Sequence, residues 1–125
     1  TGHAGWRGAA ARVAANTVDT MVGCVAVCTD IRAYVSPCIS LGAFEVGPEV
    51  AACFDEAVVH RRGDWPRPHV DLKATLRRQL EEAGVPADAI EISGHGTVRE
   101  TNDFFSHRAA DGTTGRMFGA VVLRN

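Results

Sequence analysis

Residues 71–83 are the stretch that most limits how this chain can fold. Leu72, Leu76 and Leu80 recur every four residues, and mostly charged or amide side chains fill the positions between them. This spacing predicts an amphipathic helix that buries one face and ends at Gly84. With 125 residues, the chain is long enough to bury a core as one domain.

Two further helices are predicted. Residues 9–22 are rich in alanine and should form the first helix, which Gly23 ends. Pro48 suits the first turn of another helix, which should continue from Glu49 to about Val59. The side chains expected to face the core from these helices are Val13, Thr17, Met21, Val22, Val50, Cys53 and Phe54.

Three segments have the pattern of strands. Residues 31–36 alternate apolar and polar side chains up to Pro37, and residues 90–93 are a second short strand. Residues 117–123 are too continuously apolar for a surface strand, so we expect them inside a sheet. Interleaved helices and strands predict an α/β or α+β fold with a mixed β-sheet.

The polar, proline-broken residues 60–69 predict an exposed loop in which His60 and His69 are solvated. The net charge of −2 argues against a nucleic-acid binder that relies on bulk charge. No apolar run approaches the roughly 20 residues of a membrane span, and the first residues lack the pattern of a signal peptide.

The four cysteines are Cys24, Cys28, Cys38 and Cys53. No Cys or His pair at zinc-finger spacing accompanies them. A chain this large and apolar does not need disulfides, so buried free thiols and a reducing, cytoplasmic setting are expected.

The first eight residues, Thr-Gly-His-Ala-Gly-Trp-Arg-Gly, combine an imidazole, an aromatic ring and a guanidinium with three glycines. A glycine-rich loop that opens onto a helix can present backbone N–H groups to an anion. The alternative is a tight turn with Trp6 in the core and Arg7 in solvent.

A second constellation comes late, as Phe104-Phe105-Ser106-His107-Arg108 followed by Thr113-Thr114-Gly115-Arg116. The arginines suit a phosphate or carboxylate, and the aromatic rings can stack on a base or close a pocket. Alternatively, both phenylalanines are core residues and both arginines are surface residues.

Together these segments resemble the YfiH/YlmD family, also called the laccase-domain or multicopper polyphenol oxidoreductase family, whose members are known as purine nucleoside phosphorylases. The resemblance covers essentially the whole chain and follows the order of the family's motifs. The matching segments are His3-Ala4-Gly5-Trp6-Arg7-Gly8, residues 36–40, residues 44–50, residues 70–72, residues 104–108 and residues 114–116.

The resemblance implies a mixed β-sandwich flanked by helices, in a domain about twice this length. It also implies an open zinc site with two histidines and one cysteine, of which His3 matches the last ligand. The other two ligands precede that position in the family, so residues 1–125 are expected to be the C-terminal half of a family member. The missing N-terminal half is then the expected partner, and none of the four cysteines here replaces its thiolate.

One departure from the family pattern lies after the strand at 90–93, where a cysteine is usual and this chain has Gly94-His95-Gly96-Thr97. His95 is either a site residue or a turn histidine without a role. Ser36, where glycine is common, is a milder change.

For the whole protein, the resemblance implies phosphorolysis of adenosine, inosine, guanosine and methylthioadenosine, together with adenosine deamination. Cations would hold the phosphate, a zinc-bound water would deaminate adenosine, and a titratable side chain would move protons. The candidates are His3 for metal, Arg7, Arg108 and Arg116 for phosphate, Trp6 for the wall of the substrate site, and Glu45 or His107 for proton transfer.

Two alternatives remain open from sequence. The first is copper-dependent oxidation of phenols, although copper favours histidine-rich sites and few histidines lie near the HAGWRG segment. The second is a catalytically inert chain that serves as a structural or partner-binding half. Unpaired sheet edges would make such a chain associate or aggregate.

Overall fold

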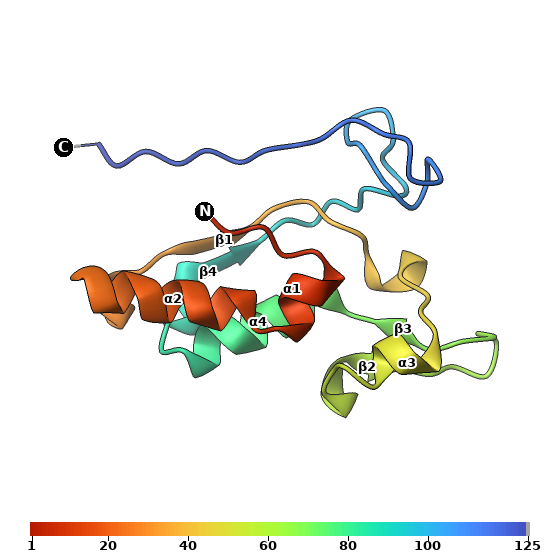
Figure 1. Cartoon of the computed structure of the whole chain (residues 1–125), viewed down its shortest axis with the longest axis horizontal. Helices are drawn as coiled ribbons and strands as arrows, with labels where there is room; N and C mark the ends of the chain where they lie inside the picture. Colours follow the sequence, from red (N-terminus) through yellow and green to blue (C-terminus); the bar gives the residue numbers. More distant parts are fainter. Residues whose placement is uncertain (125) are drawn as a thin grey trace.

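The structure, a computed structural model, describes residues 1–124. α1, α2 and α4 pack against one another, and α4 also contacts β1 and β4 (Figure 1). Helices and strands interleave along the chain, so the predicted α/β class is confirmed. The elements are α1 (Trp6–Ala10), α2 (Val13–Cys24), β1 (Ala33–Val35), α3 (Pro48–Ala51), β2 (Val59–His60), β3 (His69–Val70), α4 (Leu72–Glu82) and β4 (Ile90–Ile92), with 3-10 turns at 28–30, 41–43, 56–58 and 87–89.

The strands form one parallel and one antiparallel pair. β1 runs parallel to β4, with Ala33 opposite Ile90. β2 runs antiparallel to β3, with Val59 opposite Val70. A single bridge from Cys38 to Gly96 continues the parallel pairing, and a second bridge joins Glu45 to His69 of β3. These bridges bring the chain segments after β1 and before α3 next to residues that are distant in sequence.

The helix predicted over 71–83 is present as α4, and its burial follows the leucine pattern. Leu72, Leu76 and Leu80 are all buried. The Asp71 carboxylate caps the helix by accepting from the Ala74 N–H at 2.9 Å. Gly84 ends it with a φ of +97°, a conformation that glycine adopts readily.

The single helix predicted over 9–22 is wrong, because the chain breaks at Arg12 into α1 and α2. Arg12 has a left-handed φ of 60° and pairs with Glu82 at 2.9 Å. The carbonyl of the fully buried Ala9 accepts a 2.7 Å hydrogen bond from the Gln79 side chain of α4. Contacts with α4 therefore accompany the break, and α2 then runs through Gly23, the predicted stop, to Cys24.

The helix predicted to continue to Val59 is also wrong, since α3 ends at Ala51. The Asp55 carboxylate accepts from the Ala57 N–H at 2.8 Å and starts a 3-10 turn instead. Val58 and Val59 are buried, and Val59 belongs to β2. β-Branched side chains favour this strand pairing over a helix.

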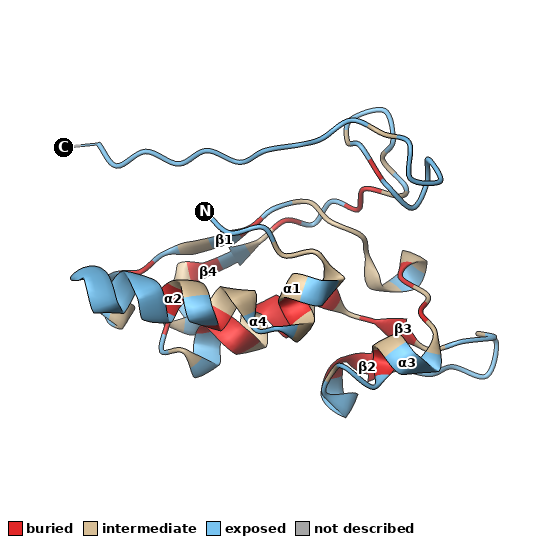
Figure 2. Ribbon diagram, in the orientation of Figure 1, coloured by how far each residue is buried: buried red, intermediate tan, exposed pale blue. Residues whose placement is uncertain are grey.

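The core is formed by buried residues from α1, α2 and α4 and from both sheets, and Figure 2 shows these elements with their buried residues in red. Val50 and Phe54 are half-buried against this core, whereas Cys53 is exposed rather than inward-facing. All four cysteines are free, as predicted, but Cys24 is exposed as well and neither Cys28 nor Cys38 is fully buried. The prediction of four buried thiols is therefore wrong.

Residues 117–123 do not lie inside a sheet, so this prediction is wrong for the chain as described. They have no regular secondary structure and run back across the top of the view in Figure 1, above β1 and the N-terminus. They form no backbone hydrogen bond with any other part of residues 1–124. Phe118 is 94% exposed and Leu123 is 93% exposed. The apolar pattern predicted burial, but residues 1–124 provide no strand beside this segment.

Candidate functional site

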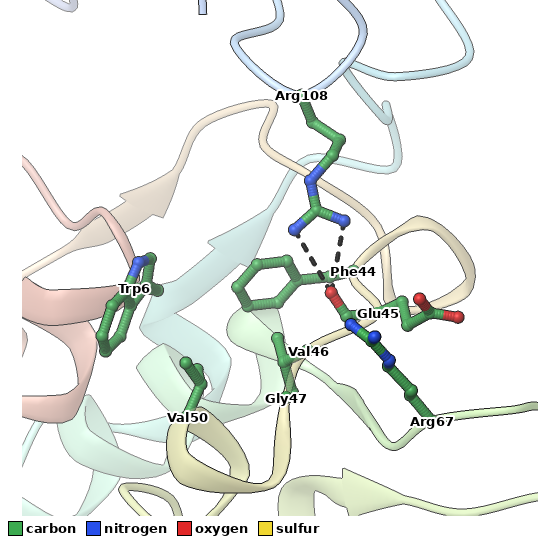
Figure 3. A pocket seen from close by; sticks show the side chains of 8 residues that line it. All are labelled: Trp6, Phe44, Glu45, Val46, Gly47, Val50, Arg67 and Arg108. Atoms are coloured by element: carbon green, nitrogen blue, oxygen red, sulfur yellow. Dashed lines mark hydrogen bonds between the residues drawn. The ribbon is translucent and has the colours of Figure 1, made fainter. Parts of the chain in front are cut away.

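The main candidate site is a cleft of about 300 Å³ on the side of α1 that faces α3. Figure 3 shows side chains from α1, from the segment around Glu45, from α3, from the loop before β3 and from the loop after β4 converging on it. The lining residues are Trp6, Phe44, Glu45, Val46, Gly47, Val50, Arg67 and Arg108.

Two aromatic residues supply the apolar sides of this cleft. Trp6 is half-buried at the start of α1 and packs against the core, and Phe44 is buried. Arg7 is exposed, and its guanidinium lies 4.5 Å from the centre of the Trp6 ring. Residues 1–5 have no regular structure and α1 begins at Trp6, so the tight turn is wrong, although Trp6 is partly in the core and Arg7 is at the surface. Trp6 also lines the cleft.

Arg108 connects the loop after β4 to the floor of the cleft. Its two terminal nitrogens each donate to the backbone carbonyl of Glu45 at 3.2 Å (Figure 3). The guanidinium also lies 5.5 Å from the centre of the Phe44 ring. Carbonyl groups do not neutralise a cation, so Arg108 brings its positive charge into the cleft.

The other predicted residues of the C-terminal cluster lie outside the cleft lining. His107 and Arg116 are exposed, and the Arg116 side chain donates only to the neighbouring Gly115 carbonyl at 3.4 Å among residues 1–124. Phe104 is half-buried and Phe105 is 55% exposed, so neither phenylalanine is a fully buried core residue.

Glu45 lines the cleft, but its backbone carbonyl rather than its carboxylate meets Arg108. Figure 3 shows the carboxylate turned away from Trp6. Within the described chain this carboxylate forms no ion pair or hydrogen bond. It is therefore a free acceptor at the rim of the cleft.

Sequence reasoning missed Arg67 and misplaced His69. Arg67 lines the cleft. His69 was predicted to be solvated, but it is only 5% exposed and its Nδ1 lies 2.9 Å from the Leu41 carbonyl. Its ring stacks on Trp65 with centroids 3.8 Å apart. In this segment prolines alternate with Trp65, Arg67 and His69, and this pattern is the sequence feature that could have indicated an ordered loop.

A separate polar cluster surrounds His95. Its Nδ1 lies 2.6 Å from the Glu100 carboxylate, whose other oxygen accepts from the Gly96 N–H at 2.8 Å. These two contacts, first the backbone N–H and then His95, hold the pKa of Glu100 below its ordinary value. Lys73 donates to the Ser93 and His95 carbonyls at 2.6 and 2.7 Å, which fixes this turn to α4.

Cys38 lies across the bridge from Gly96, beside this cluster. Burial raises the pKa of the Cys38 thiol, the charge of Lys73 opposes that effect and Asp71 adds to it. A raised pKa keeps the thiol protonated, which disfavours Cys38 as a metal-binding thiolate.

Comparison with known proteins now connects this geometry to a family. The family model described as multi-copper polyphenol oxidoreductase laccase matches residues 1–124. The chain belongs to this family. Its structure also matches two family members with known structures: the Bacillus licheniformis hypothetical protein YfiH (TM-score 0.80, 30% identity, 90% of this chain and 45% of the other) and YlmD from Geobacillus stearothermophilus (TM-score 0.77, 34% identity, 90% and 44%).

Curated relatives of the family carry names of purine nucleoside enzymes. Adenosine deaminase RL5 from an unknown prokaryotic organism is 38% identical over 98% of this chain and 49% of its own length. Purine nucleoside phosphorylase from Deinococcus radiodurans is 39% identical over 97% of this chain and 47% of its own length. The chain therefore spans about half the length of the curated relatives it matches.

The multi-copper description of this family calls for a metal site, and the residues present do not complete one. Residues 1–124 contain no group of three or more His, Cys, Asp or Glu side chains placed to hold a metal ion. His3 is exposed and folds back toward Gly5, where an added Cβ would meet its Nε2 at 3.4 Å. A catalytic zinc site uses three protein ligands, and His3 has no such set around it within residues 1–124.

No helix within residues 1–124 is both long and apolar enough to cross a membrane.

Proposed function

We propose that the protein containing this chain is a purine nucleoside phosphorylase that also deaminates adenosine. The observation that supports this proposal best is the cleft with two aromatic side chains, Trp6 and Phe44, and two guanidinium groups at one site. A purine ring suits the aromatic sides, and an oxyanion suits the cations. The names of the relatives point to the same substrates.

In phosphorolysis, a phosphate oxygen forms a bond to the anomeric carbon of the sugar while the bond from that carbon to the purine nitrogen breaks. Cations near the phosphate stabilise the charge that shifts in this step. Arg108 is the proposed phosphate residue that lines the cleft, with Arg7 stacked on the adjacent Trp6. Arg116 is proposed for the same role from the exposed C-terminal segment.

The departing purine nitrogen needs a proton. Glu45 and His107 are the proposed donors, and Glu45 is favoured because it lines the cleft.

His3 is proposed as one ligand of a zinc ion, with a His and a Cys supplied by an N-terminal half of the domain. Residues 1–124 do not complete that site. The proposed arrangement makes residues 1–125 the C-terminal half of one domain, which acts in the cytoplasm on purine nucleosides and phosphate.

The experiment joins residues 1–125 to an N-terminal half like that of the relatives and measures two products from adenosine. Adenine released only in the presence of phosphate reports phosphorolysis, and inosine reports deamination. Arg61→Gln is a matched control, because Arg61 pairs with Glu56 at 2.6 Å and does not line the cleft. A zinc-replete complete protein that turns over no purine nucleoside would falsify the proposal.

The family's description also names polyphenol oxidation with copper, and this is the second candidate. Oxygen uptake with a phenol that follows the bound copper and stops on copper chelation would favour it. If instead the isolated chain binds neither metal nor nucleoside and activity returns on mixing with the other half, the chain serves as a structural half.

A further inference from the structure

Arg67 lies in a loop that is tied closely to the floor of the cleft. The Pro68 carbonyl accepts from the Val46 N–H at 2.9 Å, and the Val70 N–H donates to the Phe44 carbonyl at 3.2 Å. Together with the bridge between Glu45 and His69, these hydrogen bonds join residues 68–70 to residues 44–46. The backbone next to Arg67 is therefore part of the wall of the cleft.

Side-chain stacking holds the same loop from its outer side. The His69 ring stacks on Trp65 at 3.8 Å with 21° between the planes, and the Arg62 guanidinium lies 4.5 Å from the centre of the Trp65 ring. The buried His69 also contacts the Leu41 carbonyl at 2.9 Å. These stacked side chains and the partly buried contact of His69 with Leu41 attach residues 65–69 to the rest of the chain.

Prolines flank Arg67 on both sides. Pro66 has a restricted φ, and Pro68 disfavours helical angles for the residue that precedes it. The backbone of Arg67 therefore has little conformational freedom to lose when a ligand binds. When a ligand binds the Arg67 guanidinium, the main entropic cost is that of ordering the side chain.

The charge of Arg67 has no acidic partner among the described residues. None of the ion pairs or side-chain hydrogen bonds within residues 1–124 involves Arg67, whereas four other arginines pair with carboxylates. Arg67 and Arg108 line the same cleft, and Figure 3 shows them approaching the segment around Glu45 from different sides. Glu45 is the one acidic residue in that lining, so the two cations outnumber it.

We propose that Arg67 binds the inorganic phosphate substrate together with Arg108. This inference rests on the proposed function, and it adds a binding residue that neither the family motifs nor the sequence pattern indicated. The Arg67 guanidinium can donate to two phosphate oxygens in the paired geometry that arginine favours, and Arg108, whose terminal nitrogens also donate to the Glu45 carbonyl, adds its positive charge. Trp6 and Phe44 leave the apolar part of the cleft to the purine.

The test compares Arg67→Ala with Arg61→Gln in the complete protein. Arg61 belongs to the same loop, is exposed and pairs with Glu56 outside the cleft. Loss of a charge-assisted hydrogen bond corresponds to about a tenfold or larger effect. Arg67→Ala should therefore raise the KM for phosphate at least tenfold, and Arg61→Gln should leave it unchanged.

Adenosine deamination uses no phosphate and provides an internal control. The proposal expects deamination and the KM for adenosine to stay near wild type in Arg67→Ala. A phosphate KM that is the same in Arg67→Ala and Arg61→Gln overturns it. So does an equal loss of deamination, because that result indicates a distorted cleft.

A binding measurement separates this inference from the proposed function. Inorganic phosphate is titrated into the complete protein, and the amide NMR signals of Val46 and Val70 are followed. Shifts that saturate in wild type and in Arg61→Gln but not in Arg67→Ala support the phosphate site even if the complete protein has no phosphorolytic activity. No saturating shift in wild type overturns the site.

Discussion

The Arg108 guanidinium donates two hydrogen bonds of 3.2 Å to the backbone carbonyl of Glu45, although 63 residues separate them in sequence. This contact joins the loop after β4 to the floor of the cleft. Arg108→Ala should therefore increase hydrogen exchange of the amides in residues 106–112. Arg61→Gln should not change it, and equal protection in Arg108→Ala and wild type would show that other contacts hold the loop.

Gln79 should be important for stability because its side chain connects α4 to α1. Its Nε2 donates to the Ala9 carbonyl at 2.7 Å, and Gln79→Ala removes this hydrogen bond, while the carbonyl keeps its 3.1 Å hydrogen bond from the Arg12 N–H. Loss of one intramolecular hydrogen bond costs about 0.5–1.5 kcal/mol. Urea denaturation should show this loss in the free energy of unfolding, whereas the neighbouring Arg78→Ala removes only a surface ion pair with Asp55 and should cost less than about 0.5 kcal/mol. Comparable values for the two variants would contradict the prediction.

Asp71 should stabilise α4 as its N-cap. Asp71→Ala removes the 2.9 Å hydrogen bond from the Ala74 N–H and should lower the free energy of unfolding by about 0.5–2 kcal/mol. Asp88→Ala is the control, since the Asp88 carboxylate caps no helix by hydrogen bonding within residues 1–124. Circular dichroism during urea unfolding measures both variants, and an Asp71→Ala midpoint equal to that of Asp88→Ala would contradict the role of the cap.

Glu100 should make the turn around His95 sensitive to acid. Its pKa is lowered in the folded state by the Gly96 N–H and by His95, so the ionised carboxylate favours folding. That contribution is present above the ordinary Glu pKa of about 4.3 and is lost as the pH falls through the lower folded value. Glu100→Gln should therefore make the free energy of unfolding less dependent on pH in this acidic range. Identical pH profiles for Glu100→Gln and wild type would contradict the prediction.

The exposed apolar segment 117–123 should make the isolated chain associate. Phe118 and Leu123 are almost fully exposed, and unpaired extended backbone with apolar side chains is prone to pairing. Light scattering of the double variant Phe118→Ser with Leu123→Ser should show less association, with an unchanged midpoint of urea unfolding. An unchanged association state would indicate that another surface is responsible. Mixing with the proposed N-terminal half should protect the amides of 117–123 from exchange.

The regular parts of this fold were predictable from sequence because local chemistry determines them. The four-residue leucine spacing and Gly84 predict both ends of α4 to within one residue. The parallel strands β1 and β4 lie within the segments predicted at 31–36 and 90–93. The cleft residues Trp6, Glu45 and Arg108 belong to motifs that are recognisable in sequence.

Tertiary contacts decided the rest. Helix propensity in residues 9–22 favoured one helix, but Gln79 and Glu82 of α4 bind Ala9 and Arg12 on either side of a break. Sequence alone did not indicate that His69 is buried, because its stacking partner Trp65 lies in a proline-broken segment that resembles a solvated loop.

What the sequence by itself determined is the α/β class, the family and the set of residue types that the site needs. Only the tertiary structure decided which of them meet: Arg67 and Arg108 share a cleft, while Arg116 lies outside it. The apolar pattern of residues 117–123 predicts burial, but burial requires a neighbouring strand. A local pattern specifies which surface needs covering, and only the packing of distant segments determines what covers it.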